Sequence, residues 1–304
     1  MTRIVAITVA IAARDRPAAL SRCLDAILAG TALPSEIVVV DQSADDAVHE
    51  VVVLRAASSP VPLRHIAQRE SGLSRSRNAA LDAATQPLIA VTDDDCVPDA
   101  RWVEVLDREL AADAAIAAVS GRVLPLGPDV EGTYAVSSRT STERREFAGK
   151  ALPWEVGTGA NFVARREWLS RIGGYDVRLG AGSPGQSGED MDVLYRLLRA
   201  GARLRYEPDA VVFHERQPLA QRTRSRFGYG HGIGACCALW GLGGDPFAAK
   251  VLARWSAMRL RRLAGAARAR DARTAKDELR VLRGTAAGIA YGLRVRRSLR
   301  RYGA

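Results

Sequence analysis

Cysteines are few in this sequence, and long apolar runs are missing. The four cysteines among 304 residues form no CxxC pair and no spacing typical of a zinc site. Cys236 and Cys237 are adjacent and can hardly bridge each other without strain, so reduced thiols in a cytosolic compartment are expected. No stretch reaches the roughly 18 apolar residues of a membrane span. We therefore expect a soluble protein or one that binds a membrane peripherally.

Acidic residues are scarce only at the C-terminal end. Residues 250–304 contain 16 Lys and Arg against three acids, Asp271, Asp277 and Glu278, which gives a net charge of +13. The first 249 residues carry 28 basic and 31 acidic residues, a net charge of −3. The whole excess of +10 thus lies in the tail. This asymmetry favours an anionic surface as a partner of the tail and not of the preceding residues.

Apolar strand-like runs alternate with helical patterns through the first 120 residues. Strands that are apolar along their length and separated by helices are typical of a parallel sheet covered on both faces. In such sheets ligands bind beyond the carboxyl ends of the strands. Asp41 and the triplet Asp93-Asp94-Asp95 each follow a predicted strand, so both fall on this edge. The strands are expected at residues 4–11, 36–40, 63–66, 88–92 and 119–123, and the helices at 17–28, 44–57, 73–84 and 102–110.

The aspartate triplet is the first candidate for chemistry. Three successive carboxylates repel one another and favour a nearby cation, and Mg²⁺ or Mn²⁺ prefers hard oxygen ligands of this kind. In an extended stretch Asp93 and Asp95 point the same way, so these two are predicted to flank a metal while Asp94 reaches another part of the ligand. The alternative is a solvated acidic turn before the next helix.

Asp41 and Arg77 are candidates for binding a nucleotide. A carboxylate at the end of the second strand can accept hydrogen bonds from a nucleobase or ribose, although an ordinary turn-forming aspartate would look the same. Arg77 lies near the start of a predicted helix in ESGLSRSRNAAL. A helix N-terminus and a guanidinium group both favour phosphate oxygens. Arg75, on the same helix, is interpreted as a solvated residue.

A second pair of acids opens the helix predicted over residues 189–200. Glu189 and Asp190 follow the loop LGAGSPGQSG. Asp190 suits a general base, which must be ionised at neutral pH and lie where a lid excludes water. Alternatively, both acids simply complement the helix dipole. His214, in the strand-like AVVFHE, would complete a metal site begun by two aspartates, but a lone histidine is more often structural.

In their order along the chain, these segments resemble the inverting glycosyltransferases of family 2, which have the GT-A fold. The resemblance covers residues 3–215, and the ordered set is far more specific than any single string. The matching stretches are IVVVDQSADD, GLSRSRNAAL, VTDDDCVPDARWV, GANFVARREWLSRIGGYD, GEDMDVLYRLLRAG and AVVFHE.

The resemblance implies a metal-dependent transfer of a sugar, with inversion, from a nucleotide-diphosphate donor to an acceptor hydroxyl. UDP is the commonest carrier in the family. Asp93 and Asp95 would form the metal-binding DxD element for Mg²⁺ or Mn²⁺, and His214 would be a further ligand. The acceptor, whether a glycan, a lipid-linked molecule or a small molecule, is not identified.

The resemblance also assigns roles around the donor and the acceptor. Asp41 would lie near the base, Asp94 near the ribose, and Arg77 near the base or the diphosphate. On the acceptor side, Asp190 would be the general base and Glu189 would help to orient the acceptor. Gly159 and Asn161 would line that side.

On this interpretation the chain has a GT-A catalytic domain over residues 1–220 and a basic helical extension over residues 221–304. The catalytic domain divides into a nucleotide-sugar-binding half, residues 1–123, and an acceptor half, residues 124–220, which opens with an irregular polar segment. Many relatives carry a QxxRW-type motif after the base, but this chain has only RQPLAQRTRSRFGYG there. That difference indicates a single transfer per encounter and not processive synthesis.

The extension mixes Arg with Leu, Trp, Phe and Ala at roughly helical spacing. A basic amphipathic helix favours an anionic membrane surface, here the inner face, and the alternative is a solvated helical face. The tail would also suit a nucleic-acid-binding α/β protein. That alternative does not explain the acidic residues that recur in order along the preceding chain. A sugar nucleotidyltransferase usually has a glycine- and arginine-rich loop after the first strand, where this chain has IAARDRPAAL without glycine.

Overall fold

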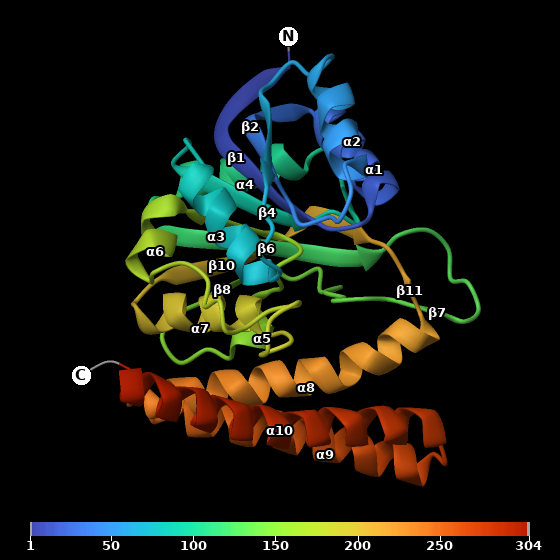
Figure 1. Cartoon of the computed structure of the whole chain (residues 1–304), viewed down its shortest axis with the longest axis vertical. Coiled ribbons are helices and arrows are strands. Elements are labelled where there is room, and N and C mark those ends of the chain that lie inside the picture. Colours follow the sequence, from blue (N-terminus) through green and yellow to red (C-terminus); the bar gives the residue numbers. More distant parts are fainter. Residues whose placement is uncertain (1, 303–304) are drawn as a thin grey trace. The chain divides into compact units, whose positions relative to one another are not determined.

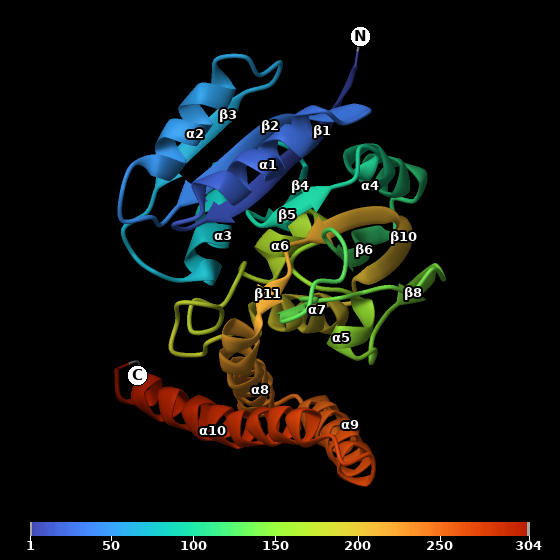
Figure 2. The same cartoon turned by 90° about the vertical axis from the view of Figure 1, so that its right-hand side faces the viewer.

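The chain forms two compact units, one built on a sheet and one on long helices (Figures 1 and 2). The computed structural model describes residues 2–302. The sheet unit contains the residues up to Tyr175 together with Val193–Gln217. The helical unit contains Asp176–Asp192 together with the residues from Pro218 onward. A segment from the middle of the sequence therefore belongs with the C-terminal helices.

Nine strands of the described residues form one mixed sheet in the sheet unit. Their order is β3-β2-β1-β4-β9-β6-β10-β5, and β8 lies beside β10. Two further short strands are β7 (Thr133–Tyr134) and β11 (Gln217–Pro218). The strands of the large sheet are β1 (Arg3–Ala13), β2 (Ala32–Asp41), β3 (Leu63–Ala67), β4 (Leu88–Asp93), β5 (Cys96–Pro98), β6 (Ile116–Pro125), β8 (Arg145–Phe147), β9 (Phe162–Arg165) and β10 (Arg203–His214).

The strands that carry the predicted ligand edge are parallel. β3, β2, β1 and β4 all run in the same direction, and β6 is parallel to β10. β9 runs antiparallel to both β4 and β6, and β5 runs antiparallel to β10. In the register of β1, Ala13 pairs with Asp41 of β2 and Ala12 pairs with Asp93 of β4. The two acidic strand ends thus lie on either side of β1, as the topology predicted.

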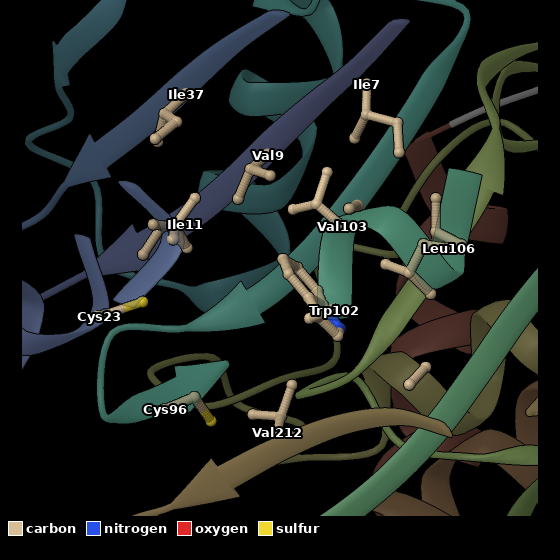
Figure 3. Close-up of a cluster of buried hydrophobic side chains, with 14 of the residues drawn as sticks. Ile7, Val9, Ile11, Cys23, Ile37, Cys96, Trp102, Val103, Leu106 and Val212 are labelled. Atoms are coloured by element: carbon tan, nitrogen blue, oxygen red, sulfur yellow. The ribbon is translucent and has the colours of Figure 1, made fainter. Parts of the chain in front are cut away.

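Helices cover both faces of the sheet because its strands are apolar on both sides. Ile7, Val9 and Ile11 alternate along β1 and pack with Trp102 and Leu106 of α4 in one buried cluster (Figure 3). Helices α1 and α2 join the same cluster, whereas α3 contacts β1 and β2 but contributes no described residue to it. α3 therefore covers the opposite face. The helices are α1 (Pro17–Leu28), α2 (Ala47–Ala56), α3 (Leu73–Ala83), α4 (Trp102–Ala112), α5 (Pro153–Val156), α6 (Arg166–Arg171) and α7 (Glu189–Arg199).

The first helix illustrates how the sequence sets these elements. Pro17 stands in the first turn, where its fixed φ and missing N–H cost nothing. Its buried residues, Leu20, Cys23, Leu24 and Ile27, recur at helical spacing and face the cluster. Complete burial of a Leu or Ile side chain contributes roughly 1.5–3 kcal/mol, so this stripe fixes α1 on the sheet next to the ligand edge.

The helical unit is built on three long helices, α8 (Leu219–Leu242), α9 (Phe247–Arg268) and α10 (Ala272–Tyr302), which lie side by side (Figure 1). Glycines let α8 and α10 touch backbone to backbone: an added Cβ at Gly230 would lie 2.0 Å from the Val281 carbonyl oxygen, and one at Gly288 would lie 1.9 Å from the His231 carbonyl oxygen. The glycine-spaced segment FGYGHGIGA therefore serves helix packing. None of the helices that the structure describes combines the length and the apolar composition that crossing a bilayer requires.

Candidate functional site

The aspartate triplet forms a tight turn between β4 and β5. Asp93 ends β4 and Cys96 begins β5, which pairs with β10 in an antiparallel register that sets His214 opposite Cys96. The Asp95 carbonyl accepts a hydrogen bond from the Glu215 amide at 2.9 Å. His214 Nε2 lies 3.6 Å from Asp95 Oδ1. Strand pairing therefore brings a histidine from far along the chain to the triplet.

Four side chains around this turn form a cluster that can hold a metal ion. Ligand atoms of Asp93, Asp95, Cys96 and His214 all lie within 4.8 Å of one another. Asp95 Oδ1 is buried and accepts no hydrogen bond from the described residues. A buried carboxylate oxygen without a donor is costly unless a cation compensates it. Two carboxylates and an imidazole therefore fit a divalent cation such as Mg²⁺ or Mn²⁺.

The hydrogen bonding of His214 suits it for metal ligation. Its Nδ1 lies 3.0 Å from the carbonyl oxygen of Glu215. A carbonyl oxygen can only accept, so Nδ1 carries a proton, and Nε2, on the side of Asp95, is the nitrogen placed to bind a metal. The imidazole is 6% exposed. The ring is thus held in the tautomer and orientation that a metal ligand needs.

Asp94 is buried and is not one of the clustered side chains. Its side chain is fully buried, and it accepts hydrogen bonds from the Arg14 amide at 3.3 Å and from Arg16 Nε at 3.2 Å. Burial raises the pKa of Asp94 to about 7, with Asp95 and Asp93 adding to the shift and the Arg16 guanidinium opposing it. A cation beside the triplet would favour the ionised form.

Arg16 is a site residue that the sequence analysis missed. It forms ion pairs with both Asp94 and Asp95. The sequence did hold a clue to it, because RDRP directly follows β1 and therefore lies at the same strand edge as Asp41 and the triplet.

Cys96 was also missed, and its chemistry sets it apart from its neighbours. Burial raises the pKa of the Cys96 thiol well above its ordinary value, and Asp93 and Asp95 raise it further. Burial does the same to the pKa of Cys23, whose Sγ lies 3.7 Å from the Asp93 carbonyl oxygen. A protonated thiol is a poor ligand for a hard cation, so the carboxylates and His214 are the members suited to Mg²⁺ or Mn²⁺.

Arg77 is buried beside Asp93 at the same edge and is fixed by several contacts. Its Nη2 donates to Asp93 Oδ1 at 3.1 Å, and its guanidinium carbon lies 5.4 Å from the centre of the Tyr175 ring. Asn78, the next residue of α3, holds Tyr175 in place by accepting a hydrogen bond from its amide and donating one to its carbonyl. Gly159 lies directly against Arg77, because an added Cβ would come within 2.7 Å of both terminal nitrogens.

Asp41 ends β2 in a hydrogen-bonded pair with a histidine. Its Oδ1 accepts from the Ser43 amide at 2.8 Å, and its Oδ2 lies 3.0 Å from His65 Nε2. His49 Nδ1 lies 3.2 Å from His65 Nδ1 in turn. The carboxylate is 7% exposed, so its direction is fixed by these neighbours.

Asn161 lies at the start of β9 with its side chain fully buried. Its Oδ1 accepts from Trp102 Nε1 at 2.9 Å, and its Nδ2 donates to the carbonyl oxygens of Arg122 and Ala210, both at 2.8 Å. The amide group therefore holds together α4, β6 and β10. The Asn161 side chain is therefore used inside the sheet unit, and the structure does not expose it to a ligand.

Glu189 and Asp190 begin α7 in the helical unit, whereas the other predicted site residues belong to the sheet unit. Gly188, with φ of 90°, makes the turn before them. Asp190 Oδ1 accepts a hydrogen bond from the Met191 amide at 2.7 Å, and Glu189 is 7% exposed.

Of the predicted site residues in the sheet unit, the structure brings Asp93, Asp95 and His214 into one cluster. It places Asp41, Asp94 and Arg77 at the same edge of the sheet.

Comparison with known proteins gives a consistent result. A family model described as glycosyl transferase family 2 matches residues 8–173. The chain is 33% identical over 151 residues to the pre-mycofactocin glycosyltransferase of Mycobacterium tuberculosis, a match that covers 47% of this chain and 30% of that protein. It is 23% identical over 224 residues to glycosyltransferase AglE of Haloferax volcanii, covering 70% of this chain and 68% of that protein.

Among solved structures, the fold is similar to that of the mannosyltransferase PcManGT from Pyrobaculum calidifontis in complex with GDP-Man and Mn²⁺. The TM-score is 0.66 at 19% identity, over 93% of this chain and 86% of that chain. This likeness confirms the predicted GT-A fold, with its mostly parallel sheet and a helical C-terminal region. The family model spans more than half of the sequence and includes the triplet, Asp41 and Arg77. The chain belongs to glycosyl transferase family 2.

Proposed function

We propose that the chain transfers a sugar from a nucleotide-diphosphate donor, most simply a UDP-sugar, to an acceptor hydroxyl with inversion, one sugar per encounter. The observation that carries this proposal is the cluster of Asp93, Asp95 and His214 at the sheet edge, beside Arg77. The fold supports it, because the similar PcManGT structure is a complex with GDP-Man and Mn²⁺. Relatives named as glycosyltransferases support the reaction class.

On the donor side, Asp93, Asp95 and His214 would hold Mg²⁺ or Mn²⁺. When bound, such an ion neutralises the negative charge that develops on a departing diphosphate. Arg77, fixed by Asp93 and Tyr175, would contribute a second positive charge at the diphosphate or base. Asp41, held by His65, would accept hydrogen bonds from the nucleobase, and the buried Asp94 would orient the ribose side.

On the acceptor side, Asp190 would remove the proton from the acceptor hydroxyl as that oxygen attacks the anomeric carbon. The bond from the anomeric carbon to the diphosphate oxygen breaks on the opposite face, and the electron pair leaves with the diphosphate. One such displacement inverts the configuration. Glu189 would orient the acceptor, and the backbone at Gly159 would line its binding region.

A ligand screen followed by one substitution tests this proposal. UDP-, GDP- and dTDP-sugars are compared by thermal shift with and without Mn²⁺, and a Mn²⁺-dependent rise in melting temperature is expected for one base. The Asp190→Asn protein should bind that donor normally while its turnover falls at least about a hundredfold. Near-normal turnover would remove Asp190 as the base. A rise in melting temperature with nucleoside triphosphates in place of the sugar nucleotides would favour a nucleotidyltransferase.

We further propose an anionic membrane surface as the partner of the helical unit, which would bring the enzyme to a membrane-borne acceptor. α9 contains no acid, and the acids of α10, Asp277 and Glu278, are buried. They pair inward with Arg222, Arg226 and Arg259. The exposed face of both helices consequently carries basic residues interleaved with exposed leucines, namely Arg261, Arg262, Lys276, Arg283, Leu260, Leu279 and Leu293.

Flotation with vesicles tests this partner. Each basic side chain near an anionic surface contributes about 1 kcal/mol, so replacing Arg261, Arg262, Lys276 and Arg283 together by Gln should abolish flotation with phosphatidylserine vesicles. Replacing Arg101, Lys150, Arg171 and Arg199 by Gln is the matched control, because these are also three arginines and one lysine, all exposed and all in the sheet unit, and it should leave flotation intact. Equal flotation of both variants would refute the membrane surface, and salt-sensitive RNA binding in its place would point to nucleic acid.

A further inference from the structure

One stripe of α8 contacts the segment that leads into Glu189 and Asp190. Gly228, Gly232, Cys236 and Trp240 follow one another at intervals of four residues, which places them on one face of the helix. This face meets residues 187–192, which belong to the same compact unit. The stripe therefore packs against the segment that contains Glu189 and Asp190, the residues proposed to orient and deprotonate the acceptor.

Hydrogen bonds connect the stripe to successive residues of that segment. Ser187 Oγ donates to the Gly228 carbonyl at 2.8 Å, and Cys236 Sγ donates to the Gly188 carbonyl at 3.3 Å. The Cys236 thiol can donate because burial raises its pKa well above the ordinary value, and the nearby Asp192 raises it further. The segment is thus bonded to α8 immediately before Glu189.

Trp240 makes the strongest of these contacts. Its Nε1 donates to Asp192 Oδ1 at 2.8 Å, and both side chains are buried. Asp192 stands in the first turn of α7, two residues after Asp190. A hydrogen bond to a buried carboxylate is stronger than one between neutral groups. Trp240 therefore fixes the turn of α7 that carries the proposed base.

The backbones of the segment and the helix also lie in direct contact. An added Cβ at Gly232 would come within 2.3 Å of Ser187 Oγ and 2.5 Å of its carbonyl carbon. An added Cβ at Gly188 would come within 3.0 Å of Cys236 Sγ. His231 and Tyr291 add bonds to the carbonyl oxygens of Gly185 and Arg178, both at 3.1 Å. Residues 187–192 and the loop before them are therefore anchored to α8 and α10 at several points.

We infer that this α8 stripe positions Asp190 for proton removal and that Trp240 is a positioning residue for the transfer reaction. The inference rests on the proposed function, in which Asp190 is the base. A base acts only within hydrogen-bond reach of the acceptor hydroxyl, and a displacement of about 1 Å can cost a hundredfold in rate. The C-terminal helices are then part of the catalytic apparatus as well as a membrane-binding surface.

The test compares two tryptophans that each donate one hydrogen bond inside the same unit. Trp240→Phe keeps the aromatic bulk and removes the donor to Asp192. Trp255→Phe is the matched control, because Trp255 Nε1 donates at 3.0 Å to Thr285 Oγ1, away from the segment. Turnover is measured as nucleotide-diphosphate release from UDP-glucose, or from the sugar nucleotide selected by the screen, with water as the acceptor. Donor affinity is measured by calorimetry of UDP, or of the corresponding diphosphate, with Mn²⁺.

Trp240→Phe should lower kcat at least about tenfold, leave donor affinity within about twofold, and speed amide hydrogen exchange in residues 187–192. Trp255→Phe should change none of these, even where it lowers the melting temperature. Suppose that Asp190→Asn abolishes turnover but the two tryptophan variants have equal kcat. That result would overturn the positioning role of Trp240 and leave the proposed function intact. An active Asp190→Asn protein would instead remove the base on which the inference rests.

A glycine pair provides a second, independent variant. Gly232→Ala places a methyl group against Ser187 and should lower kcat and speed exchange in the same segment. Gly265→Ala, on α9, meets nothing within 4 Å and should behave like wild type. Wild-type kcat and exchange in Gly232→Ala would contradict the close packing on which the inference is built.

Discussion

Two nitrogens of the Arg16 guanidinium contact the buried carboxylate of Asp94: Nη2 lies 2.5 Å from Oδ1, and Nε lies 3.2 Å from Oδ2. The same guanidinium pairs with Asp95, a proposed metal ligand. Arg16 therefore supplies positive charge to the triplet from one side, while Mg²⁺ or Mn²⁺ would supply it from the other. The arginine and the ion together would favour the ionised form of the buried Asp94, whose pKa burial raises.

Arg16→Gln should destabilise the protein in the presence of EDTA. Asp94 would keep its burial but lose its counter-charge, which costs about 1–2 kcal/mol because Arg16 itself is 45% exposed. Chemical denaturation at pH 8 measures the loss. Added Mn²⁺ should restore part of it, because binding to the folded state stabilises that state. Arg22→Gln, which breaks the more exposed pair with Glu215, is the control and should cost less. An unchanged denaturation midpoint for Arg16→Gln would contradict the role of this pair.

Asp95→Asn should remove the Mn²⁺ dependence of nucleotide-diphosphate binding. The substitution keeps the shape of the side chain and removes the charge of the best-placed oxygen, Oδ1, which is buried without a hydrogen-bond donor. We expect the dissociation constant measured by calorimetry with Mn²⁺ to rise at least about tenfold, which corresponds to about 1.4 kcal/mol. Asp99→Asn, a nearby acid whose Oδ1 accepts from the Arg101 amide, should bind normally. Equal affinities for both variants would remove Asp95 from the metal site.

The strand edge was predictable from the sequence because it follows from local patterns. Apolar runs that end at Asp41 and at Asp93 specify both strands, and parallel topology then puts their ends on one edge. The neighbours of His214 depend on a pairing between β10 and β5 that no local pattern specifies. The same limit applies to residues 176–192, since their contacts with α8 join residues 41 to 48 positions apart that share no periodicity.

Arg77→Met should weaken donor binding about tenfold by removing a fixed guanidinium from the donor side. Gly159→Ala should reproduce the effect, because its methyl group would lie 2.7 Å from both Arg77 terminal nitrogens and displace the guanidinium. Calorimetry of the nucleotide diphosphate with Mn²⁺ is the measurement. Arg75→Met is the control on the same helix, since that side chain is 42% exposed and pairs with Glu70. A normal dissociation constant for Arg77→Met would reject its assignment to the donor.

Glu36 gives a prediction about pH that is independent of the active site. Burial raises the pKa of its carboxyl, but hydrogen bonds from Thr8, from the amide and hydroxyl of Thr85 and from Arg64 outweigh burial and leave the pKa below its ordinary value. A carboxyl whose pKa is lower in the folded state contributes stability above its unfolded pKa of about 4.3 and loses it as pH falls through the folded value. Glu36→Gln should therefore cost about 1.5–3 kcal/mol at pH 7, and the difference from wild type should shrink as the pH drops below about 4. Urea denaturation across this range tests the prediction, with Glu50→Gln on the exposed side of α2 as the control for losing one negative charge. A difference that stayed constant from pH 7 to the most acidic point would mean that the ionised form of Glu36 is not what those four hydrogen bonds stabilise.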